Sequence, residues 1–229
     1  FLVNKCKLDS IKIPSGEITN KPLLEFIAQF NLPVIMSTGM ADLDEIECSI
    51  NVLTRQGLKK ENLTILHCTS QYPAEIKDIN LRSIVTMKEK FGINIGYSDH
   101  TLGSEASIAA VSLGARIIEK HITLNQTMPG PDHKASMEPD DFKAMIMAIR
   151  NIENGLGDGQ KAPTKSELEM RLVARKSLVA NKAIKKGELL TKDNLTVKRP
   201  GCGISPMRID EIIGTKSKYS FQANDLIKV

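Results

Sequence analysis

Short apolar runs rich in β-branched residues alternate with amphipathic stretches over the first 155 residues. The runs that predict strands are Ile11–Ile13, Pro33–Met36, Leu63–Cys68, Ile93–Tyr97 and Ala115–Lys120. The stretches that predict helices are 21–30, 43–56, 81–91, 104–113 and 139–153. In the second of these, Ile46, Ile50 and Leu53 recur at helical spacing, and Asp42 and Ser104 stand where N-caps are expected. This alternation predicts βαβ units and a parallel sheet.

A parallel sheet of this kind forms either an open sandwich or a barrel. Polar side chains lie at or just after every predicted strand end: 12–15, 37–38, 67–69, 98–100 and 119–121. In a (β/α)₈ barrel this edge carries the active site, so the pattern favours a barrel. Only five βα units are present, and we therefore expect the first three units of such a barrel to be missing from this chain.

The rhythm changes after residue 155. Gly155, Gly157, Gly159 and Pro163 predict a linker over 156–173, within which 166–173 could form a short helix. The linker divides a barrel part (1–155) from a small β-rich module (174–229). Residues 172–229 hold 12 Lys and Arg against 5 Asp and Glu, a net charge of +7, whereas the preceding residues carry −3. The charge difference supports a domain boundary.

Composition excludes several classes of protein. With 41% hydrophobic and 25% charged residues the chain is typical of a globular protein, and no apolar run is long enough to cross a membrane. The basic module has no interleaved aromatic residues, so we expect no nucleic-acid partner. The start at Phe1 has no signal-peptide pattern and indicates the interior of a longer chain. Four scattered cysteines predict reduced thiols in a cytoplasmic protein, with Cys48 and Cys68 in the core.

Two histidines carry the sharpest chemical signal. His100 and His121 follow two consecutive predicted strands, 93–97 and 115–120. Both histidines should therefore lie at the same edge of the sheet. Two imidazoles would suit a divalent metal such as Mn²⁺, with Asp99 and Glu119 as orienting groups or a general base. The alternative is a pair of histidines that are simply hydrogen-bonded at loop starts.

A second group of residues suits an anion. Lys12, Ser15, Ser37 and Ser98 lie at adjacent strand ends, where an ammonium and hydroxyls could hold a phosphate or carboxylate. The serines could equally cap the following helices. Lys12 stands within an apolar Ile-Lys-Ile run, so we expect it to have an anionic partner.

Two loops leave both a functional and a structural interpretation open. The loop 129–133 ends in Asp132 and His133, and it could position a sugar hydroxyl or be only a turn. Arg199 in the basic module, held extended by Pro200, could reach an active site on another subunit or be a solvated surface residue.

Seven motifs in order give a family resemblance. The chain carries KIPSGE, STGM, HCTSQYP, GYSDHT, EKHITL, PGPDHKAS and KRPGCGIS. These resemble the bacterial sialic acid synthases, which make N-acetylneuraminate or legionaminic acid, and the tail is similar to their C-terminal antifreeze-like (SAF) domain. The resemblance implies a (β/α)₈ barrel joined to a SAF domain, in a homodimer whose SAF domain swaps onto the partner's barrel.

The same resemblance implies the reaction. Phosphoenolpyruvate condenses with an open-chain N-acylmannosamine, either N-acetylmannosamine or its 2,4-diacetamido-trideoxy analogue. C3 of phosphoenolpyruvate attacks the aldehyde, water adds at C2, and phosphate leaves by C–O cleavage. Mn²⁺, or less effectively Mg²⁺, is the implied cofactor and polarises the aldehyde.

The motifs also imply residue roles. His100 and His121 match metal ligands, and Lys12, Ser15, Ser37 and Ser98 match phosphoenolpyruvate contacts. Tyr72, Asp132 and Glu119 match positions that contact the sugar or assist proton transfer. Ser70 matches a further phosphoenolpyruvate contact. Arg199 matches the SAF-domain arginine that recognises the sugar's N-acyl group across the dimer. Ser70 stands where the family often has Asn, and Cys202 replaces an Asn beside Arg199.

Two other functions are alternatives to the sialic acid synthase reaction. Another phosphoenolpyruvate–aldose synthase would share the barrel but lack the SAF module. A non-catalytic carbohydrate-binding protein would not need paired histidines at strand ends. Because substrate contacts of the early barrel strands are absent, we expect residues 1–229 alone to be inactive.

Overall fold

The computed structural model describes residues 2–229, which fall into two compact units. The first unit ends at Gly159 and the second begins at Gln160. The segment expected as a linker, 156–173, contains the helix α7 (Lys165–Ala174), so the short helix considered at 166–173 is confirmed and is one residue longer at each end. Thr164 and Glu167 form a capping box at the start of α7, and this local signal outweighs the glycines that precede it.

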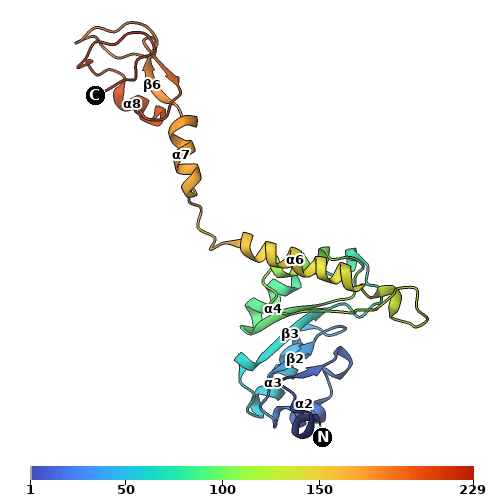
Figure 1. The fold of residues 1–229 in the computed structure, drawn as a ribbon. Coiled ribbons are helices and arrows are strands. Elements are labelled where there is room, and N and C mark those ends of the chain that lie inside the picture. Colours follow the sequence, from blue (N-terminus) through green and yellow to red (C-terminus); the bar gives the residue numbers. More distant parts are fainter. Residues whose placement is uncertain (1) are drawn as a thin grey trace. The chain divides into compact units, whose positions relative to one another are not determined.

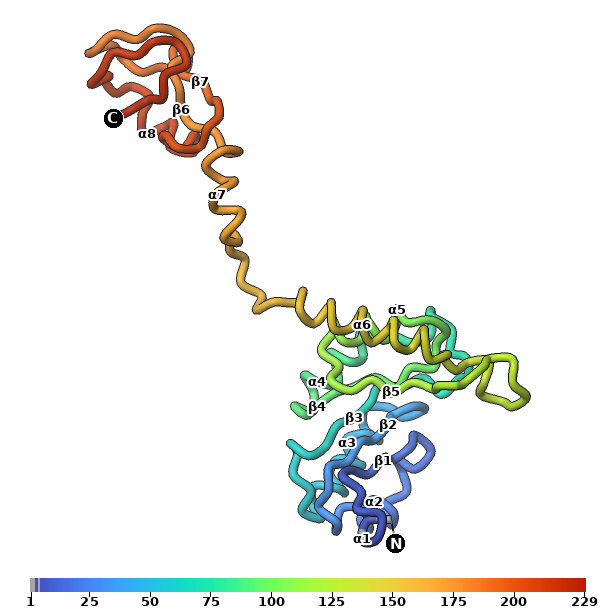
Figure 2. The backbone as a smooth tube through the Cα atoms, in the orientation of Figure 1, coloured from blue at the N-terminus to red at the C-terminus, as the bar shows by residue number. Residues whose placement is uncertain are grey.

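A five-stranded parallel sheet forms the centre of the first unit (Figure 1). Its strands follow chain order: β1 (Ile11–Ile13), β2 (Val34–Ser37), β3 (Leu63–Cys68), β4 (Asn94–Asp99) and β5 (Ile118–Lys120). The tube in Figure 2 shows the helical connections that return the chain between successive strands. The predicted α/β class and all five predicted strands are confirmed.

Helices alternate with these strands. They are α1 (Leu2–Cys6), α2 (Lys21–Ala28), α3 (Leu43–Arg55), α4 (Ser83–Phe91), α5 (Glu105–Ser112) and α6 (Pro139–Leu156), with 3₁₀ turns at Ser15–Glu17, Lys60–Asn62, Ile76–Asp78 and His133–Ala135. Helix α6 packs against α5 (Figure 2). Val111 of α5 meets Met145 and Ile149 of α6 in a small buried cluster, which fixes the last helix of this unit.

The sheet is strongly curled. Strands β1 and β5 are the two edges of the sheet. In a flat sheet, with neighbouring strands about 4.8 Å apart, these edges would be separated by about 19 Å. Nevertheless Lys12 Nζ of β1 lies 3.5 Å from Glu119 Oε2 of β5. Both side chains therefore project from the concave face, and the curl brings the sheet edges within side-chain reach of each other. A curled half-barrel is the architecture observed.

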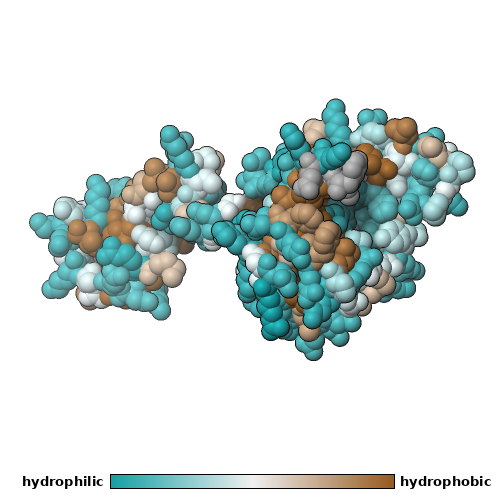
Figure 3. Space-filling view, turned by 90° about the horizontal axis from the view of Figure 1, so that it is seen from below, coloured by the Kyte–Doolittle hydropathy of each residue, from teal (hydrophilic) through white to brown (hydrophobic). Residues whose placement is uncertain are grey.

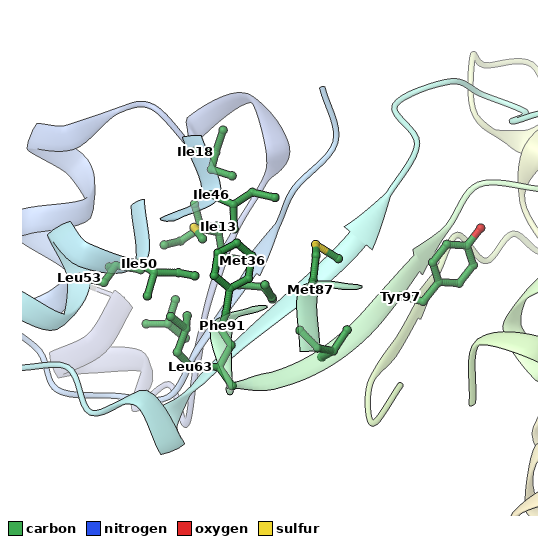
Figure 4. Packing of buried hydrophobic residues seen from close by; sticks show 14 of the residues in the cluster. Ile13, Ile18, Met36, Ile46, Ile50, Leu53, Leu63, Met87, Phe91 and Tyr97 are labelled. Carbon is green, nitrogen blue, oxygen red and sulfur yellow. The ribbon is translucent and has the colours of Figure 1, made fainter. Parts of the chain in front are cut away.

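The two faces of the sheet differ in chemistry because side chains alternate along each strand. The register aligns Ile13, Met36, Ile65 and Ile95 in one row, and all four are at most 1% exposed. This row packs against the helices, and Ile46, Ile50 and Leu53 of α3 belong to the same buried cluster (Figure 4). The opposite row begins with Lys12 and faces the concave side. The core therefore lies between sheet and helices and leaves the concave face for polar groups.

The two expected N-caps differ in the structure. Asp42 accepts hydrogen bonds from the backbone N–H groups of Asp44 and Glu45 and forms a capping box with Glu45. Ser104 occupies the N-cap position of α5 without a side-chain capping bond. The predicted position of this N-cap is therefore confirmed, and the backbone N–H of Ser104 donates to the Glu105 carboxylate at 3.0 Å.

The cysteines are all free thiols, and Cys68 is buried as expected. Cys48 is exposed, contrary to expectation. It follows Ile46 by two residues, which places it about 200° around α3 from the buried side of the helix. No helix among residues 2–229 has both the length and the apolar character needed to span a membrane. Figure 3 shows hydrophobic residues gathered on one face of the first unit within a largely hydrophilic surface.

The second unit is small and has a core of its own. After α7, strands β6 (Ser177–Ala180) and β7 (Leu195–Lys198) pair antiparallel, followed by a 3₁₀ turn at Pro206–Arg208 and α8 (Ile209–Ile212). Single bridges such as that between Ile184 and Phe221 extend the pairing. Leu178, Ile184, Leu190 and Phe221 contribute to its buried cluster. The predicted β-rich module is therefore a compact unit with an independent hydrophobic core.

Candidate active site

Lys12, Ser98 and Glu119 meet on the concave face of the first unit. Ser98 and Glu119 are ladder partners on β4 and β5, and Ser98 Oγ donates to Glu119 Oε1 at 2.7 Å. The other carboxylate oxygen, Oε2, lies 3.5 Å from Lys12 Nζ. The anionic partner expected for Lys12 is therefore Glu119, and the pair is one-third exposed, within reach of a ligand.

The two histidines lie side by side at the same edge of the sheet. The ring centroids of His100 and His121 are 5.4 Å apart, and the planes are nearly perpendicular. The Tyr72 ring lies 4.0 Å from His100 and 5.3 Å from His121, again between centroids. The backbone N–H of Ala74 donates to the His100 carbonyl at 2.8 Å, which ties the Tyr72 loop to this strand end. The predicted convergence of the histidines is confirmed.

Hydrogen bonds define the tautomer of His100. Its Nδ1 lies 2.7 Å from the Thr69 carbonyl oxygen, which can only accept, so Nδ1 carries the proton. Its Nε2 then has a free lone pair. Ser98 Oγ is 3.4 Å from Nε2, but its proton is directed to Glu119. A histidine held through one nitrogen by a backbone carbonyl presents the other nitrogen as a metal ligand.

The donor set suits a metal that keeps open coordination positions. Within residues 2–229 no group of three or more His, Cys, Asp or Glu side chains forms a complete metal cage. The buried imidazole of His100 and the neighbouring imidazole of His121 could supply two nitrogen ligands to one divalent cation. Water and substrate oxygens would then complete its coordination.

The serines at the strand ends are poised for a ligand. Ser37 Oγ is buried and makes no hydrogen bond in the described structure, although Ser37 is only 3% exposed. Ser15 Oγ accepts the Gly39 N–H at 3.0 Å, which leaves its own hydroxyl proton free to donate. A Cβ at Gly39 would collide with the Ser70 and Ser15 hydroxyls, so these three residues converge. A buried hydroxyl without a partner costs about 1–3 kcal/mol, which an anion or water here would offset.

Two further groups of the site have raised pKa values. Burial raises the pKa of the Cys68 thiol, and the Ser98 and Ser15 hydroxyls beside it only partly oppose this shift. Burial likewise raises the pKa of Tyr72, and the negative charges of Asp132 and Glu119 add to the effect. Both groups are therefore neutral at neutral pH, and Tyr72 can donate a hydrogen bond to a substrate.

Three candidates take different places. Asp132 is exposed on its loop and acts electrostatically on Tyr72, so it belongs to the rim of the site. His67 lies at a strand end but on the helix-facing side, where its Nε2 is 2.6 Å from the Ile79 carbonyl. Arg199 belongs to the second unit, where its Nε donates to the Ala174 carbonyl at 3.0 Å.

The sequence reasoning missed the groups that orient these residues. The Thr69 carbonyl and the Gly39 N–H act through the backbone, which every residue possesses, so no side-chain pattern marks them. Cys68 was expected only as a core residue, yet its Sγ lies 3.8 Å from His100 Nδ1. The role of Lys120 in a buried ion pair with Asp99 was also missed.

Comparisons with known proteins agree with this geometry. The NeuB family model matches residues 1–161, and the SAF domain model matches residues 175–228. The N,N'-diacetyllegionaminic acid synthase of Campylobacter jejuni is 50% identical over 99% of this chain and 68% of its own length. The synthase of the same name from Legionella pneumophila is 42% identical over 93% of this chain and 60% of its own length. The chain thus spans about two thirds of these relatives.

Solved structures are similar as well. The N-acetylneuraminic acid synthetase of Leptospira borgpetersenii, in complex with citrate, is 37% identical with a TM-score of 0.68, over 74% of this chain and 58% of that one. A putative spore coat polysaccharide biosynthesis protein E from Chromobacterium violaceum is 28% identical with a TM-score of 0.77, over 99% and 68%. A heptulosonate phosphate synthase of Thermotoga maritima shares only the fold, at 17% identity and a TM-score of 0.56. Motifs, fold and comparisons together place this chain in the NeuB family of sialic acid synthases, with a SAF domain at residues 175–228.

Proposed function

We propose that the protein condenses phosphoenolpyruvate with an N-acylmannosamine to give a nonulosonic acid and inorganic phosphate. The observation that carries the proposal is the conjunction on one concave face of the Lys12–Ser98–Glu119 cluster and the His100–His121 pair. The cluster offers cationic and hydroxyl donors for a phosphorylated acid. The histidine pair offers a metal site for an aldehyde.

In the proposed reaction the chain's own groups hold both substrates. Lys12, Ser15 and Ser37 bind the phosphate and carboxylate of phosphoenolpyruvate through charge-assisted hydrogen bonds. C3 forms a bond to the aldehyde carbon, water adds at C2, and the C2–O bond to phosphate breaks. Glu119, bonded to both Ser98 and Lys12, is placed to move a proton during these steps. Tyr72 and Asp132 contact the sugar.

His100 and His121 would hold Mn²⁺, or less effectively Mg²⁺. The bound ion supplies Lewis-acid polarisation of the sugar aldehyde. The support from this structure is the free Nε2 lone pair of His100 beside the His121 ring.

For the sugar we propose the 2,4-diacetamido-trideoxy analogue of mannose rather than N-acetylmannosamine. The support is the 50% and 42% identity to two N,N'-diacetyllegionaminic acid synthases. The proposed product is therefore a legionaminic acid derivative. N-acetylmannosamine is the comparison substrate.

The direct test measures phosphate release by the intact gene product. The proposal expects release only when phosphoenolpyruvate, Mn²⁺ and a sugar are all present, with faster release for the diacetamido sugar. Faster release with N-acetylmannosamine would overturn the sugar assignment but leave the condensation. Release without any sugar, or none with either sugar from folded protein that binds Mn²⁺, would overturn the proposed reaction.

Lys12→Met tests the phosphoenolpyruvate site. Loss of a hydrogen bond to a charged group weakens binding by about 1.5–3 kcal/mol, so we expect the KM for phosphoenolpyruvate to rise roughly 10- to 150-fold. Steady-state kinetics at saturating sugar measures this. The matched control is Lys21→Met, which removes an exposed lysine paired with Glu25 on α2. An unchanged KM in Lys12→Met would exclude Lys12 from the substrate site.

We also propose a complete (β/α)₈ barrel and a homodimer in which the SAF domain serves the partner's barrel. Support for the barrel comes from the curled sheet with two unpaired edge strands and from the greater length of the relatives. In the dimer Arg199 recognises the sugar's N-acyl group. Mixing Lys12→Met with Arg199→Ala protein should then restore activity, since some active sites receive both native residues. Mixtures no more active than the separate variants would contradict this arrangement.

The rival functions have less support. The SAF match argues against the heptulosonate-type synthases, whose resemblance here is one of fold alone. A non-catalytic carbohydrate-binding protein leaves the Lys12–Glu119 pair and the oriented His100 without a purpose. We place the reaction in the cytoplasm, where the four free cysteines stay reduced.

A further inference from the structure

A buried ion pair lies directly behind the two histidines. Lys120 Nζ is 2.9 Å from Asp99 Oδ2, and the two side chains are 1% and 0% exposed. Asp99 and Lys120 are ladder partners on β4 and β5. Asp99 immediately precedes His100, and Lys120 immediately precedes His121. The ion pair therefore links β4 and β5 one residue before the histidine that follows each strand.

The pair does not face the substrate side. The preceding rung of the ladder, Ser98 with Glu119, projects to the concave face. Because side chains alternate along a strand, Asp99 and Lys120 project to the helix-facing side. There Ser107 of α5 donates to Asp99 Oδ2 at 2.6 Å. The pair can therefore affect the site only indirectly, through the residues that it positions on β4 and β5.

The hydrogen bonds of the pair converge on the backbone around His100. Asp99 Oδ1 accepts from Thr101 N at 2.9 Å and from Thr101 Oγ1 at 2.8 Å. Lys120 Nζ donates to the Thr101 carbonyl at 2.8 Å as well as to Asp99. His100 is thus held between two residues that are bonded to each other and to the strand carrying His121.

We propose that the Asp99–Lys120 pair is a positioning device that sets the separation of His100 and His121 for one divalent cation. The proposal rests on the metal site of the proposed function. A buried ion pair is weak evidence for stability, since apolar replacements are often as stable, but it can specify one geometry. Here the ammonium spans from β5 to β4 and to the turn after His100, which restrains both histidine backbones at once.

The test replaces the charges together. Asp99→Asn/Lys120→Met removes the ion pair without leaving a lone buried charge and keeps an oxygen acceptor for Thr101. The matched control is Ser49→Ala, which removes a 2.6 Å hydrogen bond between Ser49 Oγ and the Ile18 carbonyl, both distant in sequence from the histidines. Ser49 is 3% exposed, so the control removes a hydrogen bond that is about as buried as the ion pair.

Two readouts are taken on the full chain. The first is the Kd for Mn²⁺ alone, from the electron paramagnetic resonance signal of the free ion. Loss of groups that orient metal ligands weakens binding 10- to 100-fold, so we expect about that increase in the double variant and less than 3-fold in the control. The second is the two-bond ¹H–¹⁵N spectrum of the histidines without metal, where we expect the single Nδ1–H tautomer of His100 to become mixed.

The outcomes separate this proposal from the proposed function. A folded double variant with unchanged Mn²⁺ affinity and an unchanged His100 tautomer overturns the positioning role. Wild-type protein that binds no Mn²⁺ overturns the metal site on which the proposal rests, and the positioning role falls with it. If the double variant does not fold, Asp99→Asn/Lys120→Gln replaces it, because this variant also leaves no buried charge and places two amides where the ion pair stood. The same increase in the Kd for Mn²⁺ is expected, and an unchanged Kd with an unchanged His100 tautomer again overturns the positioning role.

Discussion

At the scale of single residues, the chemistry of each functional group is set by one or two neighbours. The Thr69 carbonyl gives His100 its tautomer, and Glu119 accepts the hydrogen bond of the Ser98 hydroxyl, which is therefore not donated to His100 Nε2. Glu119 in turn meets Lys12 from the opposite edge of the sheet. Because Lys12 and Glu119 pair with each other, neither charge is left unpaired on the partly exposed concave face.

His67 gives a pH dependence that is separate from the site. Burial lowers the pKa of His67 from 6.5, against the hydrogen bond to the Ile79 carbonyl, which raises it. Below pH 6.5 the unfolded chain therefore binds more protons than the folded one, and the unfolding free energy decreases as the pH falls. We expect urea unfolding to show this loss between pH 7.5 and 5.5, and His67→Gln to reduce it. An identical pH slope in the variant would assign the loss to other groups.

At the scale of elements, strand and helix positions follow local pattern, whereas contacts across the sheet do not. The runs at 11–13 and 63–68 were predicted to the residue because β-branched and apolar residues are bounded there by polar turns. The β1–β5 contact between Lys12 and Glu119 could not be predicted, since it depends on the curl of the whole sheet. The short helix considered at 166–173 is present as α7, which begins with the capping box of Thr164 and Glu167.

The two N-cap positions provide a matched pair of variants. Asp42→Ala removes two hydrogen bonds to the first turn of α3, and such a loss destabilises a protein by about 1 kcal/mol. Ser104→Ala removes no capping bond of α5, and we expect a change within about 0.5 kcal/mol. Chemical denaturation of both variants measures the difference. Equal destabilisation by the two substitutions would show that the capping box contributes nothing specific.

At the scale of the whole molecule, the chain has two units with separate hydrophobic cores. The large cluster lies entirely before residue 160, and the cluster around Leu178 lies entirely after it. The sequence indicated this division through its change in charge and its glycines, but it placed the boundary a few residues early because α6 continues to Leu156. The site residues of the first unit and Arg199 of the second therefore belong to different folding units.

Leu178→Ala tests this independence. Leu178 is fully buried in the second core, and truncation of such a leucine destabilises its surroundings by about 3 kcal/mol. Hydrogen exchange followed by mass spectrometry should show faster exchange in residues 175–229 only. Matched acceleration in the strands β1–β5 would mean that the two units unfold as one.

The central claim is that this chain belongs to an enzyme that forms a carbon–carbon bond from phosphoenolpyruvate. The most direct measurement supplies the intact gene product with Mn²⁺, the diacetamido sugar and phosphoenolpyruvate labelled with ¹³C at C3, and follows the label by NMR. We expect the label to become a methylene carbon bonded to the former aldehyde carbon, with one phosphate released for each. Label in the methyl group of pyruvate, with phosphate released at the same rate, would mean simple hydrolysis and would exclude the condensation.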